Sequence, residues 1–213
     1  MNLLPYKNGK YSVYRQEAES KSVENWIKGK AFLEIEKQEL IIKKKSRKRN
    51  KLYCFHLNEL SCSTTMKVSE VSHNYKFWRR VNVYLTSLFK DYNLNSYKSS
   101  ITLHESGAPT LIPIAYWTYR LKGLNYKSYF LYENVDSELS VTELVDAIEK
   151  ISPTNKKQII EEIEDKHIAI IKSIHNAGIR HDDPHGGNIL TSFKLADLNK
   201  VSEKDINLSL IHI

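Results

Sequence analysis

The sequence has few cysteines and no long apolar segment, and both absences exclude classes of protein. Its 213 residues include two cysteines, Cys54 and Cys62, which lack the close spacing of a metal site and are too few for a disulfide framework. No run approaches the ~18 apolar residues that a membrane-spanning helix needs, and the first residues lack the apolar stretch of a signal peptide. The sequence therefore predicts a cytoplasmic chain with reduced thiols.

Positive charge exceeds negative charge, and much of the excess is concentrated in one run. Hydrophobic residues make up 41% of the chain and charged residues 27%, which is ordinary for a globular protein, while the net charge is +7. Residues 43–51 are nearly all cationic, and a self-repelling run of this kind predicts an exposed loop or hairpin tip. The loop is either simply solvated or attracted to an anionic surface, such as an acidic-lipid membrane face, a phosphorylated glycolipid or nucleic acid. Nucleic acid is the least favoured, because no aromatic-interleaved motif accompanies the charges.

The first part of the chain is rich in strand patterns. Apolar and polar residues alternate, or β-prone residues cluster, between about residues 30 and 70. A helix is expected at 74–90, and a hairpin is expected from arms at 115–121 and 128–133. The expected strands are 31–36, 39–42, 51–57 and 64–68.

The second part of the chain changes to helical patterns. Val141 to Ile151 predicts a short helix capped by Ser140, and Asn155 to Asn176 predicts the strongest helix, with Gly178 as its stop. Strands followed by helices indicate an α+β fold, with a strand-rich nucleotide-binding lobe at 1–133 and a helical catalytic lobe at 134–213.

A polar loop directly after the strongest helix has the composition of a phosphoryl-transfer site. It contains His181 and Asp183 in a His-x-Asp pattern, Asn188 five residues later, and Asp197 after a short apolar run. Transfer of a phosphoryl group to a hydroxyl needs a carboxylate that orients the hydroxyl, and amide or carboxylate oxygens that hold magnesium. We therefore interpret Asp183 as the catalytic carboxylate, His181 as a brace for the loop, and Asn188 and Asp197 as metal ligands.

Two other interpretations of this loop stay open. Asp182 could replace Asp183 as the base, although its distance to Asn188 along the chain then differs by one residue. A zinc site formed by His181, Asp183 and His185 is the main chemical rival, but it lacks a visible fourth ligand and leaves the asparagine unexplained.

With these residues in place, the segment 174–190 resembles the catalytic loop of small-molecule, protein-kinase-like enzymes, and most closely that of bacterial lipopolysaccharide core heptose kinases. The usual form in that family is His-Gly-Asp-Pro-His-x-Gly-Asn, and Asp182 stands in place of the Gly. Pro184 and His185 occupy positions where protein kinases carry Leu-Lys, which favours a sugar acceptor over a protein. The resemblance implies a protein-kinase-like two-lobed fold and transfer of phosphate from ATP, with Mg²⁺, to a sugar of the lipopolysaccharide core. It also implies a place in the cytoplasm, peripheral at the inner membrane.

The resemblance extends upstream with less specific motifs. Met66-Lys67-Val68 is similar to the strand that carries the family's phosphate-binding lysine, which implies that Lys67 steadies the α- and β-phosphates. Residues 129–136 are similar to the hinge, whose backbone, around Glu133 and Val135, would hold the adenine.

The chain departs from the family pattern in three ways. No Gly-rich phosphate loop is present, and the expected helix at 74–90 has no Glu to pair with Lys67, while Glu70 lies too early in the sequence. Few residues follow Asp197, whereas the family continues with further helices, so the resemblance implies a shortened helical lobe. These departures keep two alternatives in view: a kinase of another acceptor, such as an aminoglycoside, choline or a protein, and an inactive pseudokinase that only binds ligands.

Overall fold

The computed structural model describes two compact units of the chain. The described residues are 2–37, 50–70, 76–78, 81–82, 85, 91–120, 126–134, 139–151, 156–179, 189–191 and 208–210. The first unit comprises residues 1–98 and 112–134, and the second comprises 99–111 and 135–213. One helix, α4 (Tyr92–Glu105), begins in the first unit and ends in the second.

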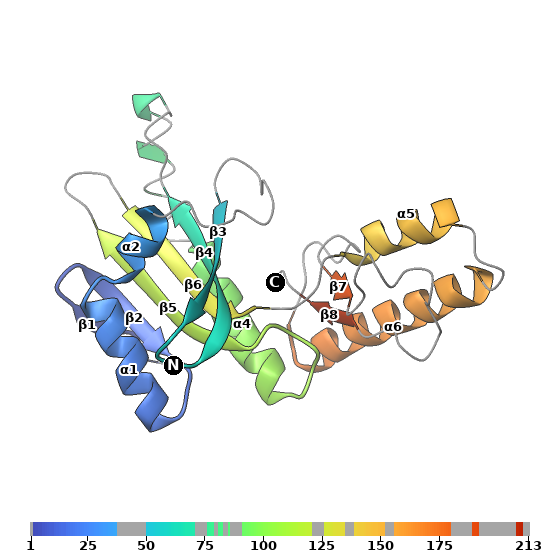
Figure 1. Ribbon diagram of the computed structural model, residues 1–213, viewed down its shortest axis with the longest axis horizontal. Coiled ribbons are helices and arrows are strands. Elements are labelled where there is room, and N and C mark those ends of the chain that lie inside the picture. The colour runs from blue at the N-terminus through green and yellow to red at the C-terminus, as the bar shows by residue number, and fades with distance from the viewer. Residues whose placement is uncertain are drawn as a thin grey trace. The chain divides into compact units, whose positions relative to one another are not determined.

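A six-stranded antiparallel sheet forms the centre of the first unit (Figure 1). The order of its strands is β1-β2-β5-β6-β4-β3, so β4 lies between β3 and β6. The strands are β1 (Leu4–Tyr6), β2 (Gly9–Val13), β3 (Asn50–Leu57), β4 (Cys62–Glu70), β5 (Pro113–Arg120) and β6 (Tyr126–Glu133).

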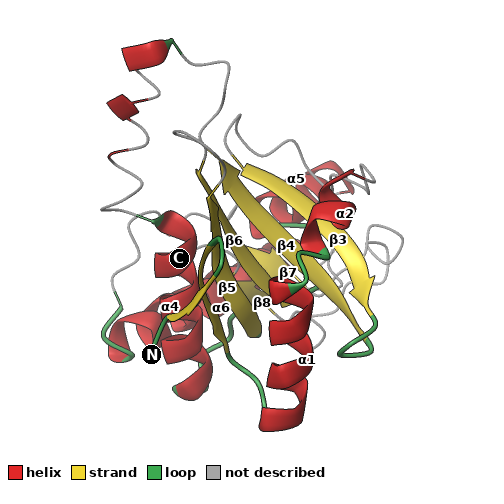
Figure 2. Cartoon of the chain, turned by 90° about the vertical axis from the view of Figure 1, so that its left-hand side faces the viewer, coloured by secondary structure: helices red, strands yellow, loops and turns green. Residues whose placement is uncertain are grey.

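The two faces of this sheet are covered by different helices (Figure 2). The helices α1 (Glu17–Lys28) and α2 (Phe32–Lys37) pack on one face, where Trp26 and Phe32 contact Trp117 and Tyr129. The start of α4 packs on the other face. Burial of this aromatic core stabilises the sheet, because each large side chain removes an extensive apolar surface from water.

The second unit is built around α5 (Val141–Ile151) and α6 (Lys156–Asn176). Apolar residues at helical spacing on α6, including Ile163 and Ile170, are buried in one core together with residues of α5. Ser140 and Glu143 form a capping box at the start of α5, with the Ser140 N–H donating to Glu143 Oε2 at 2.8 Å. A short antiparallel pair, β7 (Ile189–Thr191) and β8 (Leu208–Leu210), completes the described part of this unit.

The structure confirms the α+β class and most of the predicted elements, with corrections. The expected strand at 31–36 is wrong, because Phe32–Lys37 is helical and buries Phe32 beneath the sheet. The described positions within 74–90 are helical at 77, 78, 81, 82 and 85, whereas 39–42 lies outside the described residues. Strand β7 pairs with β8, and residues 193–196 lie outside the described residues.

Candidate functional site

The predicted catalytic loop lies between two points that the structure defines. His181, Asp183, Asn188 and Asp197 themselves lie outside the described residues, as does Val135 of the predicted hinge. What the structure describes is how the chain leaves α6 before this loop and enters β7 after it.

The exit from α6 is fixed by a glycine cap. Gly178 has a φ of +73°, a left-handed conformation that favours glycine. Its N–H donates to the His175 carbonyl at 2.9 Å, and the Ile179 N–H donates to the Ile174 carbonyl at 3.1 Å. This pair of bonds is the Schellman pattern, which ends a helix at a definite residue. The backbone therefore has a set direction two residues before His181.

The entry into β7 is fixed by burial and by hydrogen bonds. Ile189 is fully buried in the core of the second unit, and Ile179 packs against the same core. The Thr191 N–H donates to the Leu139 carbonyl at 3.0 Å. Both ends of positions 180–188 are thus attached to one hydrophobic cluster, which is the support that a loop carrying several polar groups requires.

Lys67 is a buried cation in the middle of the sheet. It lies on β4 and is 7% exposed, which is unusual because lysine is almost never fully buried without a compensating charge. It stands opposite Phe130, which in turn stands opposite Tyr116. Side chains at paired positions of neighbouring strands point to the same face. Tyr97 of α4 packs on Phe130 and Tyr116, so Lys67 points to the face that α4 covers.

Burial and one nearby carboxylate have opposite effects on the pKa of Lys67. Burial lowers the pKa of the Lys67 ammonium to about 8, and the negative charge of Asp91 acts in the opposite direction. The ammonium is therefore still mostly protonated at neutral pH, as a phosphate ligand requires. Asp91 was not among the site residues predicted from the sequence, although its position just before a helix, with polar residues after it, is typical of an N-cap.

Both the backbone N–H and the carboxylate of Glu133 have partners in the first unit. Its N–H donates to the Ile112 carbonyl at 3.0 Å, and Arg15 pairs with its carboxylate at 2.5 Å. The next residue, Asn134, accepts a hydrogen bond from the Thr65 hydroxyl at 2.9 Å. An adenine contact from Glu133 would consequently have to use its backbone carbonyl, because the N–H is already engaged.

Glu70 is not a partner of Lys67. Its carboxylate lies 3.6 Å from Lys51 and 3.4 Å from Lys127. Three positions separate Glu70 from Lys67 on the same strand, so the two side chains point to opposite faces of the sheet.

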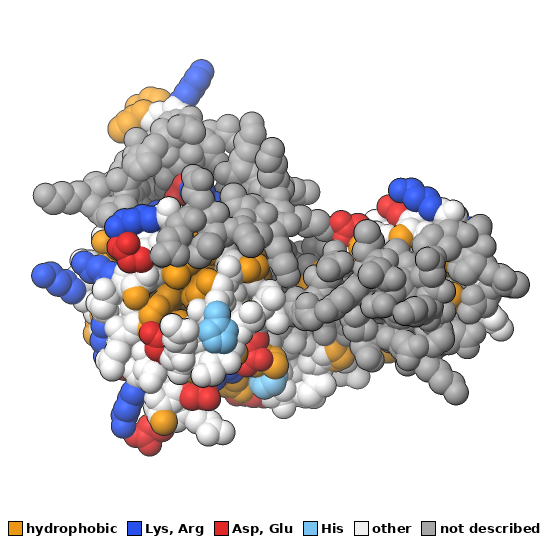
Figure 3. Space-filling model, viewed as in Figure 1, with side chains coloured by type: hydrophobic (Ala, Val, Ile, Leu, Met, Phe, Trp, Pro, Cys, Tyr) orange, Lys and Arg blue, Asp and Glu red, His pale blue; other side chains and the backbone are white. Residues whose placement is uncertain are grey.

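The cationic surface of the first unit is mixed with acidic groups where it is described. Figure 3 shows lysine and arginine side chains beside aspartate and glutamate side chains rather than on a face of one sign. Lys21 and Lys37, for example, pair with Glu17 and Glu34 at 2.9 and 2.7 Å. Of the basic run 43–51, residues 43–49 lie outside the described residues.

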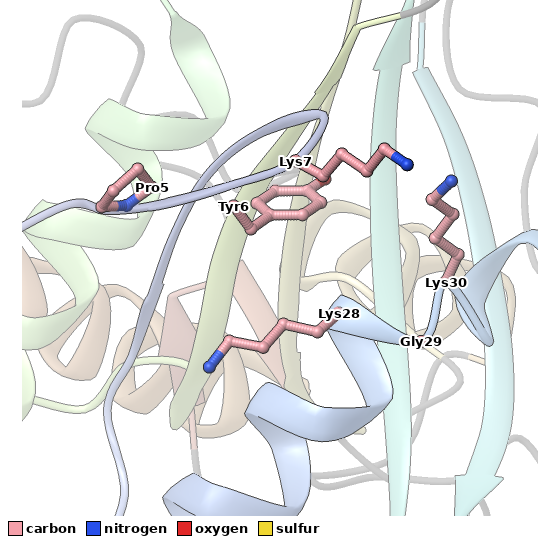
Figure 4. Close-up of a pocket in the computed structure, with 6 residues that line it drawn as sticks. All are labelled: Pro5, Tyr6, Lys7, Lys28, Gly29 and Lys30. Atoms are coloured by element: carbon pink, nitrogen blue, oxygen red, sulfur yellow. The ribbon is translucent and has the colours of Figure 1, made fainter.

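A second group of lysines lines a pocket of about 540 Å³ beside β1 and the end of α1 (Figure 4). Lys7 and Lys30 extend toward each other there, whereas Lys28 points away and pairs with Glu24 at 3.1 Å. The carbonyl end of α1 carries partial negative charge, which the lysines complement. The pocket is therefore a weaker anion site than its three lysines suggest. The lining residues are Pro5, Tyr6, Lys7, Lys28, Gly29 and Lys30.

Neither a metal cluster nor a membrane span is found within the described ranges. No group of three His, Cys, Asp or Glu side chains among them could hold a metal ion, and the predicted magnesium ligands are not among them. No helix in the described part of the chain is both long and apolar enough to cross a membrane. Of the predicted ATP-binding groups, the described residues thus include the buried cation and Glu133.

Comparison with known proteins identifies both a family and a fold. Residues 96–211, more than half of the chain, match the model of the lipopolysaccharide kinase (Kdo/WaaP) family. No curated protein sequence matches the chain. The chain resembles the solved structure "WaaP in complex with acyl carrier protein" with a TM-score of 0.51 at 15% identity, covering 85% of this chain and 63% of that one. The chain thus spans less than two thirds of the length of WaaP.

Two kinase domains resemble the chain more distantly. The BubR1 kinase domain has a TM-score of 0.42 at 14% identity and covers 99% of this chain and 48% of that one. The ROP18 kinase domain in complex with AMP-PNP and sucrose has a TM-score of 0.48 at 13% identity and covers 78% and 48%. The match to WaaP is the one that confirms the predicted kinase-like fold class.

Proposed function

The chain belongs to the lipopolysaccharide kinase (Kdo/WaaP) family, and from this premise we propose that it transfers phosphate from ATP to a sugar hydroxyl of the lipopolysaccharide core, with heptose as the sugar. The observation that carries the proposal is the family match over 96–211, because that range includes the whole predicted catalytic loop and Asp197. The fixed ends of the loop support it, since phosphoryl transfer depends on positioning and electrostatic stabilisation more than on covalent chemistry.

In this proposal each polar residue of the loop has one role. Asp183 accepts the proton of the attacking sugar hydroxyl and aims its oxygen at the γ-phosphate, and His181 braces the loop by hydrogen bonding. Asn188 and Asp197 would hold Mg²⁺, which when bound would neutralise negative charge on the phosphates. A thermal shift by ATP that requires Mg²⁺ is expected. Stabilisation by ATP that is unaffected by EDTA would contradict the assignment of these two ligands.

Lys67 would bind the α- and β-phosphates, with the backbone at Glu133 and Val135 near the adenine. Because the ammonium is buried, its attraction to phosphate is only weakly screened by water. Lys67→Met should weaken ATP binding by roughly tenfold or more, as expected for a lost charged hydrogen bond. Lys51→Met, on the neighbouring strand, is the matched control and should leave the ATP affinity unchanged.

The acceptor is tested by offering the chain a panel of substrates with γ-labelled ATP. The panel contains heptose-bearing core oligosaccharide, the same core lacking heptose, an aminoglycoside, choline and a generic protein substrate. Label only in the heptose-bearing core is the expected result. Label in another acceptor would keep the kinase and overturn the acceptor, whereas ATP binding without label in any acceptor would favour a binding module.

We further propose that the basic run 43–51 contacts the anionic glycolipid at the cytoplasmic membrane surface. A cluster of lysines and arginines is attracted to acidic lipid by about 1 kcal/mol per residue. Neutralising Lys43, Lys44 and Lys45 together should reduce sedimentation with acidic vesicles. Neutralising Lys21 and Lys37, which already pair with glutamates, is the control and should have little effect.

A further inference from the structure

Asp91 is a carboxylate that three hydrogen bonds hold in place. It stands immediately before α4, and its Oδ1 accepts from the N–H groups of Asn93 and Leu94 at 2.9 and 3.1 Å. This is the N-cap arrangement, which satisfies donors that the first turn of a helix leaves open. Its Oδ2 accepts from the Tyr116 hydroxyl at 2.8 Å. The carboxylate is therefore fixed both to its own helix and to strand β5.

The start of α4 is attached to the sheet at Lys67 itself. The side-chain amide of Asn93, a fully buried residue, donates to the Ser128 carbonyl at 2.8 Å and to the Lys67 carbonyl at 3.4 Å. Tyr97, one turn further along α4, stacks on Tyr116. These contacts place the first turn of α4 on the face to which the Lys67 side chain points.

Charge complementarity singles out the same pair. Among the described residues, Asp91 is the charged group whose field opposes the effect of burial on the Lys67 ammonium. Tyr116, which lies two strands from Lys67 on the same face of the sheet, donates its hydroxyl to Asp91. The other nearby carboxylate on β4, Glu70, lies on the opposite face with Lys51 and Lys127.

We propose that Asp91 is the positioning residue of Lys67: the cap carboxylate of α4 orients the buried ammonium and keeps it charged for binding the phosphates of ATP. The role toward ATP rests on the proposed function. Protein kinases require a lysine–glutamate ion pair in which the glutamate comes from within a helix. Here the expected helix at 74–90 has no glutamate, and the carboxylate comes instead from the cap of the following helix. The cap hydrogen bonds hold this short side chain in one position, whereas a longer glutamate side chain would have more rotamers.

The Asp91→Asn variant isolates the charge from the cap. Asparagine caps helices about as well as aspartate and has the same shape, so the variant should fold. Titrating the Lys67 side chain by ¹³C NMR in the full chain, with Lys67→Arg to identify its resonance, reports the pair without any ligand. The midpoint is expected to fall by about one pH unit in Asp91→Asn, because a nearby opposite charge is removed. An unchanged midpoint would overturn the proposal.

Glu70→Gln is the matched control, since it removes a carboxylate from the same strand but from the opposite face. It should leave the Lys67 midpoint within a few tenths of a pH unit of the wild-type value, as expected for a charge screened by solvent. A fall as large as that of Asp91→Asn would overturn the assignment of Asp91 as the specific partner.

Nucleotide affinity measured against pH separates this inference from the proposed function. Wild-type affinity for Mg–ATP is expected to decline as the pH rises above about 8, where Lys67 loses its proton, and Asp91→Asn should show the decline at lower pH. A decline at the same pH in both proteins would overturn the inference and leave the kinase proposal standing. No binding by the wild type at any pH would overturn the proposed function, while the NMR titration would still test the pair.

Discussion

The hydroxyl of Tyr116 donates a hydrogen bond to Oδ2 of Asp91 at 2.8 Å, which ties a strand in the centre of the sheet to the cap of α4. Tyr116 is 2% exposed, so its hydroxyl has little access to water that could replace this bond. The contact thus joins β5, in the centre of the sheet, to the start of α4, on the face to which Lys67 points.

Replacing this tyrosine measures the contact directly. Tyr116→Phe should lower the free energy of unfolding by about 1 kcal/mol, because a buried acceptor loses its donor. Tyr92→Phe, at an exposed position at the start of α4, should change the free energy of unfolding by less than about 0.5 kcal/mol. Urea unfolding gives both values, and equal losses in the two variants would contradict the importance of the Asp91 bond.

The cap itself gives a second prediction. Asp91→Ala removes the acceptor for two N–H groups of α4 and should cost about 1 kcal/mol of stability, whereas Asp91→Asn should cost much less. Chemical denaturation monitored by circular dichroism is suitable. If asparagine is as destabilising as alanine, capping is not what Asp91 contributes to stability.

The burial of Lys67 predicts an unusual dependence of stability on pH. The folded chain holds the Lys67 proton less tightly than the unfolded chain, since burial lowers the pKa from its ordinary value of 10.5 to about 8. Between these two pH values the unfolded chain binds more protons at this residue, so the contribution of Lys67 to the free energy of unfolding rises with pH. The destabilisation caused by the buried Lys67 ammonium is greatest below about pH 8 and disappears as the pH approaches 10.5.

Lys67→Met should therefore be more stable than the wild type at pH 7, by an amount on the order of 3 kcal/mol. The difference between the two proteins should shrink as the pH approaches 10.5, which urea titrations at several pH values would measure. Taking the difference removes the contribution of other groups that titrate in this range. A difference that stays constant with pH would show that the lysine is not buried as a cation.

The two glycine caps provide a matched pair of variants for testing the predicted catalytic loop. Gly178, after α6, and Gly107, after α4, have φ values of +73° and +75°, and neither has an atom within 4 Å of an added Cβ. Replacing either with alanine should cost about 1 kcal/mol of stability through backbone strain alone. Gly178→Ala should also reduce phosphate transfer, because it redirects the chain just before His181, whereas Gly107→Ala should not. Equal activity of the two variants would contradict the positioning role of the α6 cap.

The helices of the second unit could be predicted from the sequence because their buried faces are apolar. Ile159, Ile163, Ile170 and Ile174 recur at helical spacing, and Ser140 with Glu143 gave the cap. The same argument explains why α4 was missed. Several of its buried positions are polar, namely Asn93, Ser96 and Ser100, so it has no apolar stripe to detect.

Other differences between prediction and structure also have identifiable physical causes. Residues 32–37 alternate like a strand, but six residues give too short a pattern to decide between strand and helix. In the structure the segment is helical, with Phe32 buried against Trp117. The pairing of β7 with β8 joins positions far apart in sequence, which no local pattern encodes. Lys67 was predicted as a phosphate ligand by resemblance to a family motif, whereas the proximity of Asp91 depends on tertiary contacts and required the structure.

The most direct measurement of the central claim is transfer of label from γ-labelled ATP to heptose-bearing core oligosaccharide by the wild type and by Asp183→Asn and Asp182→Asn. The account predicts Mg²⁺-dependent labelling that Asp183→Asn reduces to background without loss of folding, while Asp182→Asn retains far more activity. Full transfer by Asp183→Asn, or no transfer by a wild-type chain that is folded and binds ATP, would contradict it.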